Sequence, residues 1–171
     1  MYFGGGTPSF LSTSQLRGLV DRLKAIQSWD DAEEITFECE PGTLTEPKLK
    51  AIREMGVTRL SLGVENFSDR ILEINGRAHR TPEIGRAYDY GRALGFPQIN
   101  IDLIAGMLGE TDDKWRDCME KTLALEPDSV TIYQMELPFN TTISKNLLTG
   151  ANAVPTQVAG WAIKRRWVKE A

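Results

Sequence analysis

Two stretches of the sequence decide the fold: RLSLGVE at residues 59–65 and INIDLI at residues 99–104. In both, large apolar residues alternate with polar or small ones, a period of two that is typical of a β-strand with two different faces. The alternation puts Glu65 opposite the leucines of the first stretch and Asp102 opposite the isoleucines of the second. Each predicted strand therefore has one apolar face and one face with a carboxylate near its C-terminal end.

Helical and extended patterns alternate along the rest of the chain. Ser12 and Gln15 form a capping box before an apolar helical face, and Pro82 stands at the start of another helix. The expected strands are 2–3, 35–40, 60–65, 99–104 and 130–135, and the expected helices are 12–26, 45–55, 68–74, 81–95, 111–123 and 158–168.

Strands that alternate with helices form parallel βαβ units, either in a (β/α) barrel or in a doubly wound sheet. Glu38, Glu65 and Asp102 all lie near strand ends on the non-apolar face, which favours the barrel because those faces would meet in one interior. Charges are costly to bury in a closed, packed barrel. We therefore expect an open or wide α/β barrel that holds a polar ligand at the C-terminal ends of its strands.

Composition excludes several classes of protein. The 171 residues are 41% hydrophobic and 26% charged, which is typical of one globular domain. Twenty Lys and Arg against 24 Asp and Glu give a net charge of −4, so no nucleic-acid partner is expected. No apolar run reaches the ~20 residues of a membrane span, and no signal peptide follows Met1. Two cysteines are too few for a disulfide scaffold, and we expect a cytoplasmic location.

Several residues are candidates for a binding site. The Gly4–Pro8 turn would allow a ligand close to the backbone, although it lacks the spacing of a known phosphate loop and could be only a tight turn. Glu38, Glu65 and Asp102 could bind ribose hydroxyls, an ammonium group or a metal, while each alone could be a solvated carboxylate. Arg77 could pair with a substrate carboxylate, or be an ordinary loop arginine.

Other polar and sulfur groups are given structural roles. A single histidine, His79, excludes a histidine-based metal cluster. Cys39 and Cys118 are expected in the core, and the basic residues between Lys164 and Lys169 are expected on a solvated helix face.

In this order and spacing, the motifs resemble the oxygen-independent coproporphyrinogen III oxidase family of radical S-adenosylmethionine (SAM) proteins. The resemblance covers about residues 2–138. The segments that carry it are YFGGGTPS (2–9), FECEPG (37–42), RLSLGVE (59–65), GRAH (76–79), NIDLIAG (100–106) and ET (110–111).

The resemblance implies a partial (β/α)6 TIM-like barrel with strands 2–6 of the family present, SAM as cofactor, and a [4Fe–4S] cluster on a CxxxCxxC loop. It implies residues 1–138 as the core, and 139–171 as a lid or linker and the start of a C-terminal helical region. The implied SAM-binding residues are Gly5, Gly6 and Thr7 at the methionyl amino end, Glu38 and Asp102, Arg77 at the carboxylate, and Met135 packed against SAM.

Two departures from the family pattern stand out. CxxxCxxC is absent, so the chain resembles an N-terminally truncated fragment with no metal ligands of its own and no radical chemistry alone. Glu65 stands where the oxidases and chaperones carry glutamine; a carboxylate there could accept from both ribose hydroxyls.

The resemblance leaves the reaction open. The first expectation is a parent enzyme that forms a 5′-deoxyadenosyl radical and oxidises a porphyrinogen or another organic substrate, with electrons from a donor such as flavodoxin or ferredoxin. The alternatives are a haem chaperone, and a radical SAM methyltransferase or cyclopropanase of the same family. The catalytic residues stay unknown.

Overall fold

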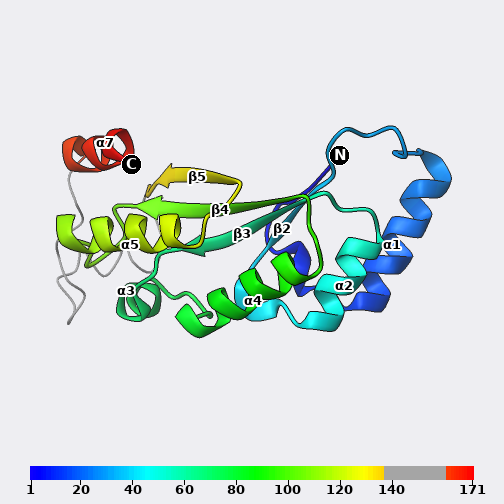
Figure 1. The fold of residues 1–171 in the computed structure, drawn as a ribbon, viewed down its shortest axis with the longest axis horizontal. Helices are drawn as coiled ribbons and strands as arrows, with labels where there is room; N and C mark the ends of the chain where they lie inside the picture. The colour runs from blue at the N-terminus through cyan, green and yellow to red at the C-terminus, as the bar shows by residue number, and fades with distance from the viewer. Residues whose placement is uncertain (137–160) are drawn as a thin grey trace.

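The computed structural model describes residues 1–136 and 161–171. Within them, a single five-stranded sheet is parallel throughout, and its spatial order follows the chain from β1 to β5 (Figure 1). The strands are β1 Tyr2–Phe3, β2 Thr36–Cys39, β3 Arg59–Glu65, β4 Gln98–Ala105 and β5 Ser129–Gln134. A strand order that never reverses is that of a barrel segment, and the doubly wound alternative is excluded for this sheet.

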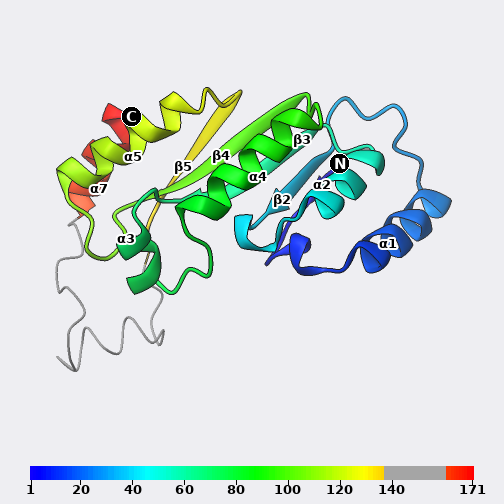
Figure 2. The same cartoon turned by 60° about the horizontal axis from the view of Figure 1, so that its bottom comes forward.

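The helices follow the strands in the expected alternation. Figures 1 and 2 show α2, α4 and α5 along one face of the sheet, which leaves the other face free of them. The helices are α1 Thr13–Ile26, α2 Glu46–Glu54, α3 Asp69–Ile74, α4 Thr81–Ala93, α5 Asp112–Ala124 and α7 Trp161–Glu170, with 3-10 turns η1 Pro8–Phe10 and η2 Pro41–Thr43. Among the described residues, no helix combines the length and the apolar character needed to cross a membrane.

The predicted helix starts are confirmed by their caps. The Ser12 hydroxyl accepts the Gln15 amide at 3.2 Å, and the Gln15 side chain accepts the Ser12 amide at 2.9 Å. Thr45 and Thr111 cap α2 and α5 with one hydrogen bond each, in which the hydroxyl oxygen accepts the amide of Lys48 or Lys114 at 3.4 Å. These caps satisfy backbone N–H groups that have no partner inside the helix.

The core lies between the sheet and its helices. Leu60 and Leu62 of β3 and Ile99 and Ile101 of β4 are fully buried there, which confirms the face assigned to them by alternation. Burying each such side chain contributes roughly 1.5–3 kcal/mol. The two cysteines, one in β2 and one in α5, are both buried and unpaired, as expected.

Helix α7 packs on α5 and the end of the sheet. The Trp167 ring stacks on Trp115 with ring centres 6.1 Å apart, and its indole N–H donates to Asp112. The expectation of a wholly solvated basic face is wrong for Lys164, which is only 6% exposed and donates to the Met135 carbonyl at 2.8 Å. Its stem lies against Gly106, where the missing Cβ leaves room for it.

Part of the predicted C-terminal organisation lies outside the described residues. This holds for the lid expected at 139–153, for the domain boundary at 138/139, and for residues 158–160 of the last predicted helix. The rest of that helix is found as α7.

Substitution by alanine should have opposite effects on stability at two glycines of α4, Gly85 and Gly91. A Cβ on Gly91 would lie 3.0 Å from Ile99 Cδ1 and 3.4 Å from Leu60 Cδ2, whereas one on Gly85 would meet no atom within 4 Å. Gly85→Ala should raise the free energy of unfolding by about 0.5–1 kcal/mol, because alanine favours the helix. The free energy of unfolding of Gly91→Ala should be about 1–3 kcal/mol lower than that of Gly85→Ala, because the added methyl group overpacks the core. Denaturant titration of both variants measures the difference, and equal effects would contradict this packing.

Candidate functional site

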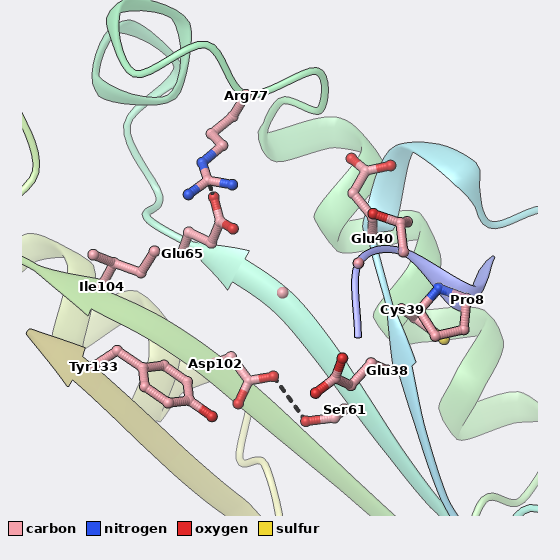
Figure 3. A pocket seen from close by; sticks show the side chains of 13 residues that line it. Pro8, Glu38, Cys39, Glu40, Ser61, Glu65, Arg77, Asp102, Ile104 and Tyr133 are labelled. Atoms are coloured by element: carbon pink, nitrogen blue, oxygen red, sulfur yellow. Dashed lines mark hydrogen bonds and ion pairs between the residues drawn. The ribbon is translucent and has the colours of Figure 1, made fainter. Parts of the chain in front are cut away.

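A cleft of about 280 Å³ opens at the C-terminal ends of the strands, on the face that α2, α4 and α5 leave free (Figure 3). Each of β2, β3, β4 and β5 contributes a polar side chain to it, and the glycine turn after β1 forms one wall. The lining residues are Gly6, Thr7, Pro8, Glu38, Cys39, Glu40, Ser61, Gly63, Glu65, Arg77, Asp102, Ile104 and Tyr133.

Most of the residues predicted from the sequence meet in this cleft. The lining includes Gly6, Thr7, Glu38, Glu65, Arg77 and Asp102. Gly5 is next to it, and its amide donates to Glu38 Oε2 at 3.2 Å. Met135 is not brought into the lining: its amide and carbonyl bind Ala105 and Lys164.

The glycine turn is required by its geometry. A Cβ on Gly4 would lie 2.5 Å from Tyr2 Cε1 and 2.8 Å from the Glu38 carboxyl carbon, so a side chain there would displace the hydrogen-bonded Tyr2 and Glu38 side chains. Gly5 and Gly6 have φ values of +85° and +86°, which favour glycine, and a Cβ on either would point into open space. The backbone beside the cleft is thus uncovered by side chains.

Two hydrogen bonds hold the Glu38 side chain near the C-terminal end of β2. Its Oε1 accepts the Tyr2 hydroxyl at 2.5 Å, and its Oε2 accepts the Gly5 amide. The hydrogen bond to the carboxylate, with burial second, raises the pKa of Tyr2 to about 12. Tyr2 therefore stays a neutral donor that orients Glu38.

Asp102 belongs to a polar network across three strands. Its carboxylate accepts the Ser61 hydroxyl at 2.7 Å and the Asn100 amide at 2.8 Å. The Asn100 oxygen in turn accepts hydroxyls from Ser129 and Thr131 of β5. Burial raises the pKa of Asp102, and the hydrogen bonds from Ser61 and Asn100 oppose that rise.

Glu65 ends β3 in an unusual conformation. Its φ is +65°, and a bulge shifts the β3–β4 register between Gly63 and Glu65. For a residue with a side chain, such a φ costs about 1–3 kcal/mol. The bulge leaves Glu65 among the cleft-lining residues, so the face assigned to it by alternation is confirmed.

Arg77, from the loop between α3 and α4, meets Glu65 in the cleft (Figure 3). Arg77 Nε lies 2.5 Å from Glu65 Oε2, yet neither of these shielded atoms has a partner in hydrogen-bond geometry. Burial raises the pKa of Glu65, while Arg77 lowers it. The Arg77 side chain stays 39% exposed, so its guanidinium is accessible from the cleft although Nε faces Glu65.

Two residues that line the cleft and one buried behind it were not among the candidate binding residues from the sequence. Glu40 and Tyr133 line the cleft, and His79 is buried behind Glu40, with 2.8 Å between His79 Nδ1 and Glu40 Oε1. Alternation could have found two of them: Glu40 shares a face with Glu38, and Tyr133 shares one with Thr131. His79 belongs to the GRAH segment, but no local pattern predicts its contacts, because both partners are distant in sequence.

The described residues do not fit an iron–sulfur cluster. None of their histidine, cysteine and acidic side chains form a group of three or more that could hold a metal. Burial raises the pKa of Cys39 well above its usual range and that of Cys118 to about 12, so both thiols stay protonated. Cluster ligation needs several thiolates in close proximity.

Comparison with known proteins gives a family. Residues 1–122 match the model of the Radical SAM superfamily. The heme chaperone HemW of Bacillus subtilis is 32% identical over 158 residues, which are 92% of this chain and 42% of that protein. The oxygen-independent coproporphyrinogen III oxidase of Pseudomonas aeruginosa is 32% identical over 135 residues, 78% of this chain and 29% of that protein.

The fold is also found in solved structures. Coproporphyrinogen III oxidase (HemN) of Escherichia coli, described as a radical SAM enzyme, superposes with a TM-score of 0.85 at 24% identity, over 99% of this chain and 38% of that one. This confirms the partial TIM-like barrel. The chain spans about two fifths of the length of its first curated relatives. The chain belongs to the radical SAM superfamily, within its group of oxygen-independent coproporphyrinogen III oxidase-like proteins.

Proposed function

We propose that the cleft binds SAM and that the chain is the SAM-binding part of a radical SAM protein. One observation carries the proposal: carboxylates from three neighbouring strands and one arginine line a single cleft. SAM offers matching groups, because it carries two ribose hydroxyls, an ammonium, a carboxylate and a sulfonium.

The charge of the cleft supports a cationic ligand. Four lining carboxylates, Glu38, Glu40, Glu65 and Asp102, face one lining cation, Arg77. A cleft with walls of one sign concentrates ligands of the opposite sign. Zwitterionic SAM with its sulfonium has a net charge of +1, whereas S-adenosylhomocysteine has none.

Each side chain has a role that its chemistry allows. Glu65 and Asp102 accept from hydroxyl or ammonium donors, and Arg77 binds a carboxylate through its planar guanidinium. The open backbone of Gly5, Gly6 and Thr7 provides N–H and C=O groups beside them. The chain's own residues thus bind and orient SAM. The resident [4Fe–4S] cluster of the family does not fit the two buried thiols, so no radical step is assigned to this chain.

For the longer protein, we propose a porphyrin-like substrate and an electron donor such as flavodoxin or ferredoxin. The porphyrin-like substrate is supported by the names of the relatives, which are heme chaperones and coproporphyrinogen oxidases, and the electron donor is what the radical SAM family implies. A heme chaperone is the second candidate, since proteins of that name match 92% of this chain. Haem binding without turnover of coproporphyrinogen by the longer protein would favour it. The two free cysteines suit a reducing compartment, and we propose the cytoplasm.

Charge selectivity tests the binding proposal directly. SAM should bind this chain about tenfold more tightly than S-adenosylhomocysteine, a difference of about 1.4 kcal/mol, because only SAM brings a cation to the acidic cleft. Isothermal titration at low and high salt measures both ligands, and salt should reduce the preference. Equal affinities, or no binding of either ligand, would contradict the proposal.

Glu65 should contribute to that affinity. Glu65→Ala should weaken SAM binding by about 1.5–3 kcal/mol, the range for a hydrogen bond to a charged group. Glu65→Gln should cost less, because one acceptor oxygen is retained. Lys121→Gln, which removes an exposed ion pair with Asp117 on α5, is the matched control and should bind as the unmodified chain does. An unchanged dissociation constant for Glu65→Ala would remove this residue from the site.

The number and burial of the cysteines predict that this chain will not assemble an iron–sulfur cluster. Reconstitution with iron and sulfide under anaerobic conditions should leave this chain without the visible absorption of a cluster, because it has only two cysteines and both are buried. Iron and sulfide analysis after gel filtration gives the stoichiometry. Four irons per chain would show that the ligands are present after all.

A further inference from the structure

His79 occupies an unusual position for a lone histidine. It lies in the loop between α3 and α4, and its side chain is 1% exposed. Nδ1 is 2.8 Å from Glu40 Oε1, at the end of β2, and Nε2 is 3.1 Å from the Val64 carbonyl oxygen, near the end of β3. The ring therefore joins two strand ends to the loop that carries Arg77.

Both partners of the ring are hydrogen-bond acceptors. A neutral imidazole has one N–H and one lone pair, so a neutral His79 would direct a lone pair at one of the two oxygens. Only the imidazolium, with an N–H on each nitrogen, satisfies both contacts. Glu40 is suited to be its anion, since the same Oε1 also accepts the Gly42 amide at 3.1 Å.

The charges around the ring support the cationic form. Glu40 at the end of β2 and Glu65 at the end of β3 attract a proton to it, while Arg77 and Arg80 belong to its own loop. A Cβ on Gly42 of the neighbouring turn η2 would lie 3.4 Å from His79 Cβ, so this uncharged residue also packs against the histidine. Burial disfavours the charge, but the bonds to Glu40 and Val64 outweigh it and raise the pKa of His79.

His79 contacts the backbone next to Glu65 and belongs to the loop that carries Arg77, and both of these residues line the cleft. The Val64 carbonyl directly precedes Glu65, whose φ is +65°. That oxygen also accepts the Asn66 amide at 2.7 Å, so two donors fix the bulge. On the loop side, Arg80 donates to the carbonyls of Arg77 and His79.

We propose that His79 is a positioning residue that acts as an imidazolium: its two N–H groups bind Glu40 and the Val64 carbonyl, and thereby hold Glu65 and Arg77 in the ligand-binding cleft. His79 itself is not among the cleft-lining residues and acts through these neighbours. The part of this inference that concerns the ligand rests on the proposed SAM binding, and the part that concerns the ring does not.

The charge state of the ring is directly measurable, because the chain contains a single histidine. In ¹⁵N-histidine-labelled protein, both ring nitrogens should give the signals of protonated nitrogens at pH 7, and the titration midpoint should lie above the ordinary 6.5. Glu40→Gln keeps an acceptor but removes the anion, and should lower that midpoint. A signal from one unprotonated nitrogen at pH 7, or a midpoint that Glu40→Gln leaves unchanged, would overturn the proposal.

The pH dependence of binding tests the positioning role. Both contacts are satisfied below the folded-state pKa of His79, and one of them is lost as the pH rises through it. SAM affinity should therefore fall over the same pH interval as the NMR titration. His79→Gln should bind about tenfold more weakly at pH 7, the effect of one ordinary hydrogen bond, and should lack this interval. Lys121→Gln should retain the profile of the unmodified chain.

The outcomes separate the two proposals. If SAM does not bind at any pH while the ring is doubly protonated, the proposed function fails and the role of His79 in holding the bulge stands. If SAM binds and His79→Gln keeps the same affinity and profile, the positioning role is wrong and the function stands. If His79→Gln does not fold, Glu40→Gln decides, because its lowered ring midpoint should shift the binding profile equally.

Discussion

The five strands run parallel, and the site depends on this constraint. In a parallel sheet all carboxyl ends lie at one edge, so Glu38, Glu65 and Asp102 meet although long helical connections separate them in sequence. The returning helices bury the leucines and isoleucines of one face and leave the other face to polar side chains. The same alternation that builds the core therefore also builds the cleft.

Carboxylates gathered at one edge repel each other, and the structure gives each of them local partners. Glu38 accepts from Tyr2 and the glycine turn, Asp102 from the polar network of β3 and β4, and Glu40 from His79. Glu65 is different, because its contact with Arg77 is an ion pair without hydrogen-bond geometry. The Arg77 side chain is 39% exposed and that of Glu65 is 16% exposed, so this pair presents a partly solvated guanidinium to the cleft.

Local patterns predicted the strands, the helix starts and most of the cleft. The period of two placed Glu65 and Asp102, and the consecutive glycines indicated a backbone turn that a ligand could approach, of which Gly6 lines the cleft. Contacts between distant segments could not be predicted in this way. Lys164 was expected in solvent because lysine usually is, but Gly106 leaves space for its stem. The His79 contacts to Glu40 and Val64 likewise depend on how a loop crosses two strand ends, which no periodicity encodes.

The distribution of chemistry over the chain follows from what each ligand needs. SAM can be held by carboxylates, a guanidinium and open backbone, all of which a parallel sheet presents at its C-terminal edge. A cluster needs several neighbouring thiolates. Cys39, the cysteine beside the cleft, provides none, because its thiol stays protonated. Cys39 Sγ is 3.8 Å from the Phe37 carbonyl oxygen, within the core, and burial keeps it protonated. The two cysteines therefore do not supply cluster ligands, whereas carboxylates, a guanidinium and open backbone for a polar ligand meet in one cleft.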